Sequence, residues 1–388
     1  MKRVNVILAI ILLLTGCSGI RKSDKESNAF ITVDVSKNYP KKELILQDFM
    51  DVEYIPLETS GEFLTQGHVL DIGKDILIVK NSVNNGDIFI FDRKGKGLRK
   101  FNRLGSGPEE YTFILGVVLD EVNNEIFVND HSIRKILVYD FYGKFIRSFN
   151  HKEEAEYDNM YNFDRDKLIC RDASYRAITE DIQSFVIISK QDGSIIKEIQ
   201  IPFEKKKSTI VMQTIEQGVI ASGIRHSPII PYNESWILLE TSSDTIYTYS
   251  SDYKLTPFMT RIPSVQSMNP EMFLFPEMLT DSYYFMKTVK KEYDFTTGKG
   301  FPNTHLLYDR QEKKIYECTV YSGDFTTKRV VEVMQRPIDK EIAFWHKLEA
   351  YDLFEAHEKG ELKGKLKEIA AELEEDSNPV IMLVKNKR

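Results

Sequence analysis

The sequence predicts an all-β protein, a six-bladed β-propeller of four-stranded antiparallel blades with a short helix inserted near the C-terminus. The main observation is a strand–turn–strand unit that recurs with a glycine in its turn, at Gly95, Gly143 and Gly193, 48 and then 50 residues apart. A period near 50 residues with four short strands is typical of propellers. A β-sandwich also has short strands, but it does not account for the constant spacing.

The first two repeats show four apolar runs each, separated by Gly, Asn and Asp turns. The strands expected from them are 69–72, 75–80, 88–92 and 98–101, then 114–119, 125–128, 136–139 and 145–149. Three further units end near 185–199, 235–253 and 283–316. One blade cannot bury both of its faces alone, whereas a ring of blades buries each blade against its neighbours.

The sixth blade has to come from the C-terminal region, with a strand from residues 30–57 closing it. A sheet that joins both ends of the chain hides the edges of the ring. Near the C-terminus, residues 361–373 carry apolar side chains with the spacing of an amphipathic helix, at Leu362, Leu366, Ile369 and Leu373. We expect this helix to pack on its own protein, although such a stripe also suits a partner.

The N-terminus reads as a targeting segment. Lys2 and Arg3 precede a short apolar run that ends Leu14-Thr15-Gly16-Cys17, which looks like a bacterial lipobox. We therefore expect residues 1–16 to be a lipoprotein signal peptide, Cys17 the lipidation site, 17–29 a polar tether and 30–388 one propeller. The alternative is an ordinary signal peptide with an incidental cysteine. By resemblance to lipoprotein sorting in enteric-type bacteria, Ser18 favours the outer membrane of the cell envelope.

The charge and the cysteines of the chain narrow the classes of partner and cross-link that we expect. Net charge is −7 and no basic tract stands out, so nucleic acid is not an expected partner. A lipid on Cys17 makes the membrane an expected one. Cys170 and Cys318 fall in strands of different repeats, so two free thiols are expected rather than a disulfide.

Four local motifs resemble a known family, the six-bladed β-propeller lipoproteins of gram-negative bacteria, a domain of unknown function with an NHL-like propeller. The motifs are Tyr54-Ile-Pro-Leu-Glu-Thr59, Gly105-Ser-Gly-Pro-Glu-Glu-Tyr111, Asp244-Thr-Ile-Tyr247 and Asn378-Pro-Val-Ile381. The family loop usually reads Gly-x-Gly-Pro-Gly-Glu-Tyr, and Glu109 replaces its third glycine here. The resemblance implies the fold and brings no catalytic residues.

No metal, cofactor or catalytic motif is expected from the sequence. The seven histidines have no tight ligand spacing, and neither a nucleophile elbow nor a phosphate-binding loop is present. In a propeller, the loops joining the second strand to the third and one blade to the next share a face, here called the loop face. Candidate ligand-binding residues on these loops are Arg103, Tyr111, His131, Arg134, Arg171, Tyr175, Arg225 and His226.

These residue types can stack on sugar rings and grip carboxylates or hydroxyls. The favoured function is therefore a binding module for a glycan, a peptide or a protein. The alternatives are a propeller lyase or hydrolase with an axial-pocket active site, and a structural subunit of an envelope complex that uses the C-terminal helix.

The lipid anchor gives a direct test. Cys17→Ala removes the thiol that would carry the diacylglycerol, so the protein should move from the membrane fraction to the soluble fraction after cell disruption. Ser18→Ala, which leaves the thiol in place, is the matched control. Retention of the Cys17→Ala protein in the membrane fraction would refute lipidation as the tether.

Overall fold

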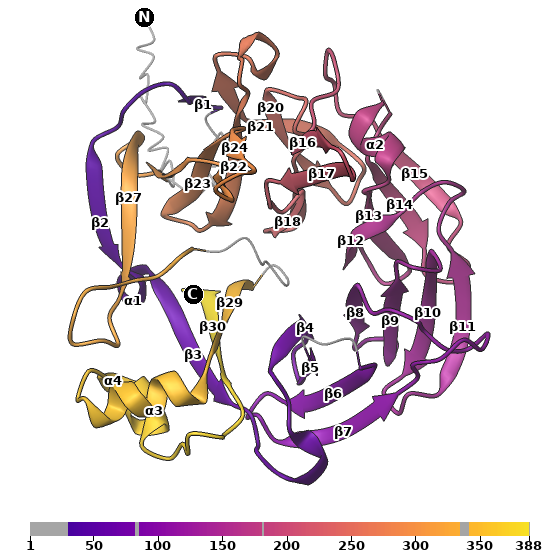
Figure 1. Ribbon diagram of the computed structural model, residues 1–388, viewed down its shortest axis with the longest axis vertical. Helices are drawn as coiled ribbons and strands as arrows, with labels where there is room; N and C mark the ends of the chain where they lie inside the picture. The colour runs from indigo at the N-terminus through magenta and orange to yellow at the C-terminus, as the bar shows by residue number, and fades with distance from the viewer. Residues whose placement is uncertain (1–29, 82–84, 181, 334–340, 388) are drawn as a thin grey trace, which may run out of the picture.

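The structure is a computed structural model of a ring of β-sheets around a central axis (Figure 1). It describes residues 30–81, 85–180, 182–333 and 341–387. The expected signal peptide 1–16, the lipidation site Cys17 and the tether 17–29 lie outside these residues.

The first three blades are four-stranded antiparallel sheets in chain order from the axis outward. Blade 1 is β4 (His68–Ile72), β5 (Ile76–Lys80), β6 (Asp87–Asp92) and β7 (Gly97–Asn102). Blade 2 is β8 (Gly116–Asp120), β9 (Glu125–Asp130), β10 (Lys135–Asp140) and β11 (Phe145–Asn150). Blade 3 is β12 (Tyr157–Asn162), β13 (Lys167–Asp172), β14 (Phe185–Ser189) and β15 (Ile195–Ile199). The strands predicted for the first two repeats are confirmed to within about two residues.

The other three blades each include a strand from the N-terminal segment. Blade 4 is β18 (Ile229–Tyr232), β19 (Ser235–Leu238), β20 (Thr245–Ser250) and β21 (Leu255–Ile262). Blade 5 is β22 (Met272–Leu279), β23 (Tyr283–Lys290), β26 (Asn303–Asp309) and β27 (Lys314–Ser322), with β28 (Arg329–Val330) beside β27. In blade 6 the described strands are β29 (Ile342–Leu348), β30 (Val380–Asn386) and β3 (Met50–Pro56).

The N-terminal segment runs around the outside of these three blades (Figure 1). Strand β1 (Ile31–Asp34) pairs in parallel with β21, and β2 (Lys41–Ile45) pairs in parallel with β27. Strand β3 then pairs antiparallel with β30. The expected closing strand from residues 30–57 is β3 in blade 6, and the same stretch also covers the outer edges of blades 4 and 5. Each added strand satisfies backbone groups that a bare edge would leave unpaired.

Six apolar clusters of the core each lie between two neighbouring blades, and a seventh lies at the C-terminal helices. Strand β6 shows how one strand serves two of them. Ile88 and Ile90 pack against blade 2, whereas Phe89 and Phe91 pack against blade 6. Successive side chains of a strand point to opposite faces of its sheet. The middle strands are therefore continuous apolar runs, because both faces of a blade are buried.

Two helices, not one, are inserted in blade 6 between β29 and β30: α3 (Ala350–Glu358) and α4 (Gly364–Ala370). The predicted helix 361–373 was too long. Residues 361–363 are extended instead, since Leu362 bridges to Phe325 and the Lys363 amide donates to the Asp324 carbonyl. Leu362, Leu366 and Ile369 are buried in one cluster with α3, so the apolar stripe packs on its own protein.

Smaller elements complete the chain. They are α1 (Leu46–Phe49), α2 (Tyr175–Thr179), the 3-10 helices η1 (Gly61–Phe63) and η2 (Val265–Ser267), the hairpin β16 (Ile210–Ile215) and β17 (Gly218–Gly223), and the hairpin β24 (Tyr293–Asp294) and β25 (Lys299–Gly300). No helix in the described part of the chain is long and apolar enough to cross a bilayer.

The three turn glycines that revealed the repeat are required by backbone geometry. Gly95, Gly143 and Gly193 have φ angles of +85°, +76° and +72°, a region that residues other than glycine rarely adopt. A Cβ atom at position 143 would lie 2.5 Å from the ring of Phe101, at the end of the outer strand of blade 1. The glycine thus allows each turn to approach the preceding blade.

A matched set of glycine replacements tests this contact. Gly143→Ala combines an unfavourable φ with a clash, so we expect it to lower the free energy of unfolding by roughly 2–4 kcal/mol. Gly298→Ala has the unfavourable φ of +67° but open space around it, and should cost about 1 kcal/mol. Gly116→Ala has neither feature and should change stability by less than about 0.5 kcal/mol. Equal effects in urea unfolding would contradict the proposed contact.

Candidate functional site

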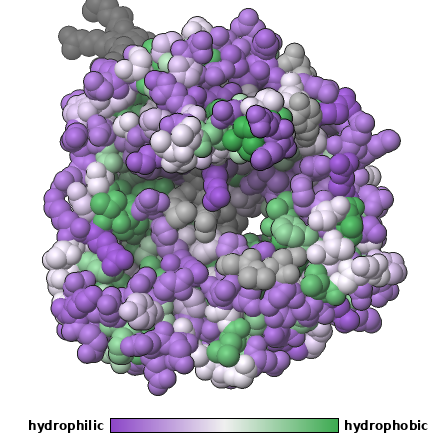
Figure 2. Space-filling model, in the orientation of Figure 1, coloured by the Kyte–Doolittle hydropathy of each residue, from purple (hydrophilic) through white to green (hydrophobic). Residues whose placement is uncertain are grey.

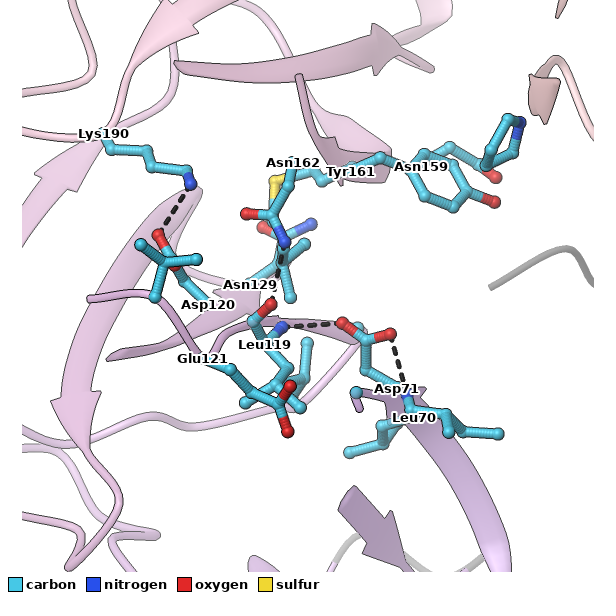
Figure 3. A pocket seen from close by; sticks show the side chains of 18 of the residues that line it. Leu70, Asp71, Leu119, Asp120, Glu121, Asn129, Asn159, Tyr161, Asn162 and Lys190 are labelled. Carbon is cyan, nitrogen blue, oxygen red and sulfur yellow. Dashed lines mark hydrogen bonds and ion pairs between the residues drawn. The ribbon is translucent and has the colours of Figure 1, made fainter. Parts of the chain in front are cut away.

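A cavity of about 650 Å³ lies among the inner strands of the propeller, and we call it the axial channel. It is lined by the inner strands β4, β8 and β12 together with Pro231 and Trp236 of blade 4. Figure 2 shows an opening near the middle of the molecule, and Figure 3 shows side chains of this axial channel. Its lining mixes aliphatic side chains with carboxylates and amides.

Several polar groups in the channel are engaged in joining one blade to the next (Figure 3). The Leu119 amide donates to Oδ2 of Asp71 at 2.6 Å, and Nδ2 of Asn162 donates to the Leu119 carbonyl at 2.8 Å. At the channel lining, Nζ of Lys190 lies 2.6 Å from Oδ2 of Asp120, and both side chains are buried. Although burial alone would raise the pKa of Asp120, its hydrogen bonds with Lys190 and Asn123 lower it. These contacts give the channel polar walls with a structural role.

A second cavity, of about 320 Å³, lies on the loop face between blades 3 and 4. We call it the blade 3–4 cleft. Its lining comes from five segments of the chain between residues 158 and 241. The residues used below are Asp158, Arg171, Lys206, Lys207, Arg225, His226 and Glu240. Three of the eight predicted ligand-binding residues, Arg171, Arg225 and His226, thus line one cavity.

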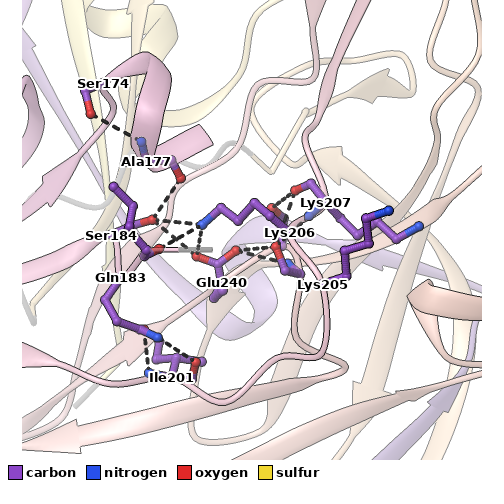
Figure 4. A network of polar contacts seen from close by, with 12 residues as sticks. Ser174, Ala177, Gln183, Ser184, Ile201, Lys205, Lys206, Lys207 and Glu240 are labelled. Atoms are coloured by element: carbon purple, nitrogen blue, oxygen red, sulfur yellow. Dashed lines mark hydrogen bonds and ion pairs between the residues drawn. The ribbon is translucent and has the colours of Figure 1, made fainter. Parts of the chain in front are cut away.

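A buried ion pair forms one wall of the cleft (Figure 4). Nζ of Lys206 lies 2.9 Å from Oε2 of Glu240, and the two side chains are only 6% and 4% exposed. The Ser184 hydroxyl donates to Oε2 of Glu240 at 3.3 Å, and the Ser242 hydroxyl donates to Oε1 at 2.7 Å. A buried carboxylate with these partners is compensated, whereas loss of one partner would leave an isolated buried charge. The pair therefore holds blades 3 and 4 together at the cleft.

The other basic groups of the cleft are more accessible. Arg171 donates to Oδ2 of Asp158 at 3.2 Å and keeps a 20% exposed side chain. Lys207 lies 3.3 Å from Glu271. Arg225 is exposed and has no hydrogen bond or ion pair to any residue that the structure describes.

His226 is a neutral group in this setting. Its ring stacks on Phe275 with centroids 4.8 Å apart, and Nδ1 lies 3.2 Å from the Ile224 carbonyl. Burial lowers the pKa of His226 to about 3, and the positive charge of Arg171 acts in the same direction. Because a carbonyl only accepts hydrogen bonds, Nδ1 carries the proton and Nε2 is left as an acceptor.

Tyr111 and Arg103 have structural contacts instead of a place in either cavity. Tyr111 is fully buried, its hydroxyl donates to the Gly86 carbonyl at 2.6 Å, and it accepts from the Arg103 amide at 2.9 Å. Nε of Arg103 donates to the Gly143 carbonyl of blade 2 at 2.8 Å. The Gly105–Tyr111 loop therefore forms the crossing from blade 1 to blade 2. Glu109 does not have a positive φ, so the missing third glycine causes no strain there.

His131 and Arg134 form a separate group on the loop face. Both lie near Glu156, with a distance of 2.8 Å between Arg134 Nη2 and Oε1 and of 3.8 Å between His131 Nε2 and Oε2. Tyr175 begins α2, and its side chain lies outside what the structure describes. Of the eight residues predicted on the loop face, the blade 3–4 cleft thus includes only Arg171, Arg225 and His226.

Sequence reasoning missed the acidic and lysine partners in the cleft. The run Lys205-Lys206-Lys207 could have indicated that Lys206 and Lys207 belong to a charged site. No sequence pattern marks Asp158 and Glu240 as their neighbours in the cleft. Within the described residues, no group of three His, Cys, Asp or Glu side chains is arranged to hold a metal ion. Cys170 and Cys318 are buried free thiols, and burial raises the pKa of each.

One histidine near the loop face couples stability to pH. His151 is 6% exposed, its Nε2 lies 2.9 Å from Oδ1 of Asn129, and its Nδ1 accepts from the Tyr157 amide at 3.2 Å. Burial lowers the pKa of His151 to about 4. Protonation of Nδ1 would also break the bond from Tyr157, so the folded state keeps the neutral ring.

We therefore expect stability to be lost in acid. A histidine with a lowered folded pKa stabilises the protein above its ordinary pKa of about 6.5, and this contribution disappears as the pH falls toward 4. The loss is on the order of 3 kcal/mol for His151. Urea unfolding at pH 7 and pH 4 checks this: His151→Gln should be less stable at pH 7 and should lose less stability on acidification. An unchanged difference between the two pH values would contradict it.

Among the solved structures that match this chain, one is similar enough to support the fold. The solved structure of a candidate exported protein from Bacteroides fragilis matches with a TM-score of 0.59 at 16% identity, over 92% of this chain and 100% of that one. A DUF4221 family member from Bacteroides vulgatus matches with a TM-score of 0.41 at 12% identity, over 88% and 98% of the two chains. Virginiamycin B lyase from Staphylococcus aureus gives 0.37 at 10%, over 87% and 100%.

The search of curated proteins found no match. The family comparison is specific, because one family model covers residues 30–385, almost the whole propeller. This confirms the resemblance to a propeller family of unknown function. The chain belongs to the DUF4934 family, a domain of unknown function.

Proposed function

We propose that this propeller is a binding module of the cell envelope that takes a glycan, a peptide or a protein on its loop face. The observation that carries the proposal is the blade 3–4 cleft. Arg171 and the adjacent pair Arg225 and His226 come from two separate segments and line a single cavity. Its volume of about 320 Å³ lies at the lower end of the range for small-molecule sites, about 300–1,000 Å³.

The chemistry of the cleft favours binding over acid–base catalysis. A general base works best with a pKa near the operating pH, and the pKa of His226 is lowered to about 3. The carboxylates of the cleft are held in ion pairs, Asp158 with Arg171 and Glu240 with Lys206. In the axial channel, Asp71 accepts hydrogen bonds from two backbone amides, of Ile72 and Leu119. These groups are therefore better suited to holding a ligand or a blade than to moving protons.

The location is part of the same proposal. A lipid on Cys17, followed by the tether 17–29, would attach the propeller to the outer membrane through β1, at the outer edge of blade 4. The loop face would then be available to a ligand in the periplasm or at the cell surface.

Capture from envelope extract tests the proposal. We expect the immobilised protein to retain a reproducible set of envelope glycans or proteins, identified by mass spectrometry. Arg171→Ala with Arg225→Ala should deplete this set at least about fivefold, because these arginines supply charged donors in the cleft. Arg134→Ala, an arginine of the same face outside the cleft, is the control and should retain it. Identical sets for all proteins would refute the binding role of the cleft.

A further inference from the structure

The chemistry of the blade 3–4 cleft points to a class of ligand, and this inference rests on the proposed function. Four basic side chains line the cleft against two acidic ones. Lys206 is already neutralised by Glu240, and Lys207 by Glu271, which lies next to the cleft lining. The positive charge that is left over is that of Arg225, which has no partner among the described residues.

The arginines leave donors to spare. An arginine carries five N–H donors, and Arg171 uses one of them in its bond to Asp158. Arg225 uses none within the described part of the chain. A guanidinium donates hydrogen bonds and cannot accept one, so the complementary group on a ligand is an oxyanion, which accepts several. The oxyanion that matches the planar guanidinium best is a carboxylate.

The arginines require an acceptor on the ligand, whereas the neutral His226 requires a donor. With its proton on Nδ1 facing the Ile224 carbonyl, His226 offers Nε2 as an acceptor that makes no hydrogen bond to a described residue. The stack on Phe275 fixes the plane of the ring. An acceptor in a cleft rich in donors calls for a ligand hydroxyl or N–H group next to the oxyanion.

The cleft also adjoins the axial channel, because Asp158 and Asn159 line both cavities. The channel adds further amides and aromatic rings, among them Tyr161 and Trp236, whose centroids lie 5.6 Å apart. A ligand with more than one polar ring could extend from the cleft along this lining. This favours a saccharide over a small free acid.

We propose that the blade 3–4 cleft binds a hydroxylated carboxylate of the sugar-acid type, with the carboxylate held by Arg171 and Arg225 and a hydroxyl donating to Nε2 of His226. The ligand carboxylate would give Arg225 an ion-pair partner that no described residue supplies. The Lys206–Glu240 pair keeps the two blades at the spacing that the ligand requires.

Calorimetric titration of the full-length protein in detergent micelles tests the ligand class. The probes are D-glucuronate, D-glucose, which lacks the carboxylate, cyclohexanecarboxylate, which lacks the hydroxyls, and quinate, a hydroxylated acid that is not a sugar. We expect D-glucuronate to bind, and glucose and cyclohexanecarboxylate to bind at least about tenfold more weakly. Quinate binding as tightly as glucuronate would overturn the preference for a sugar acid. Glucose binding as tightly as glucuronate would overturn the carboxylate assignment.

Variants assign the roles of the side chains. Arg225→Ala removes an exposed side chain that makes no hydrogen bond or ion pair within the described residues, so the variant should fold normally and bind glucuronate about tenfold more weakly. Arg134→Ala should leave glucuronate binding unchanged. His226→Phe keeps the stacked ring and should reduce the preference for glucuronate over cyclohexanecarboxylate to about twofold or less. Unaltered glucuronate affinity in Arg225→Ala would overturn the site. If no hydroxylated acid binds but capture from envelope extract still depends on Arg225, the ligand class fails while the binding function stands.

Discussion

The antiparallel ladder between β3 and β30 is the contact on which the rest of the structure depends. It pairs Met50 through Pro56 with Asn386 through Val380, so residues from the two ends of the chain form one sheet. Without it, blade 6 would lose its outer strand, and blade 1 would lose part of the apolar surface against which Phe89 and Phe91 pack. Because every blade is buried by two neighbours, an opening at one interface exposes apolar surface on both sides.

The strap formed by β1 and β2 extends this closure. These strands cover the outer edges of blades 4 and 5, while the outer strands of blades 1 to 3 carry no further partner among the described residues. The half of the ring that the N-terminal segment reinforces also includes blade 4, one side of the cleft. The lipid anchor proposed at Cys17 would therefore attach to the reinforced part of the ring, through β1.

The site follows from the way neighbouring blades meet. A propeller places the loops of successive blades next to one another. Charged residues far apart in sequence can therefore line one cavity between two blades. Here the Lys206–Glu240 pair joins the blades, and the accessible groups of Arg171, Arg225 and His226 lie in the space that remains. The polar walls of the axial channel arise in the same way, through bonds such as that between Asp71 and the Leu119 amide.

The sequence by itself determined the fold class, the strand positions of the first two repeats and the need for the turn glycines, because these depend on local alternation and on backbone geometry. It also indicated the face on which Arg171, Arg225 and His226 lie. Only the tertiary structure decided that these three share a cavity, that Tyr111 is buried and that Lys206 pairs with Glu240. It also showed that residues 30–57 span three blades and that 361–363 are extended. These outcomes depend on contacts between residues distant in sequence, which no local pattern records.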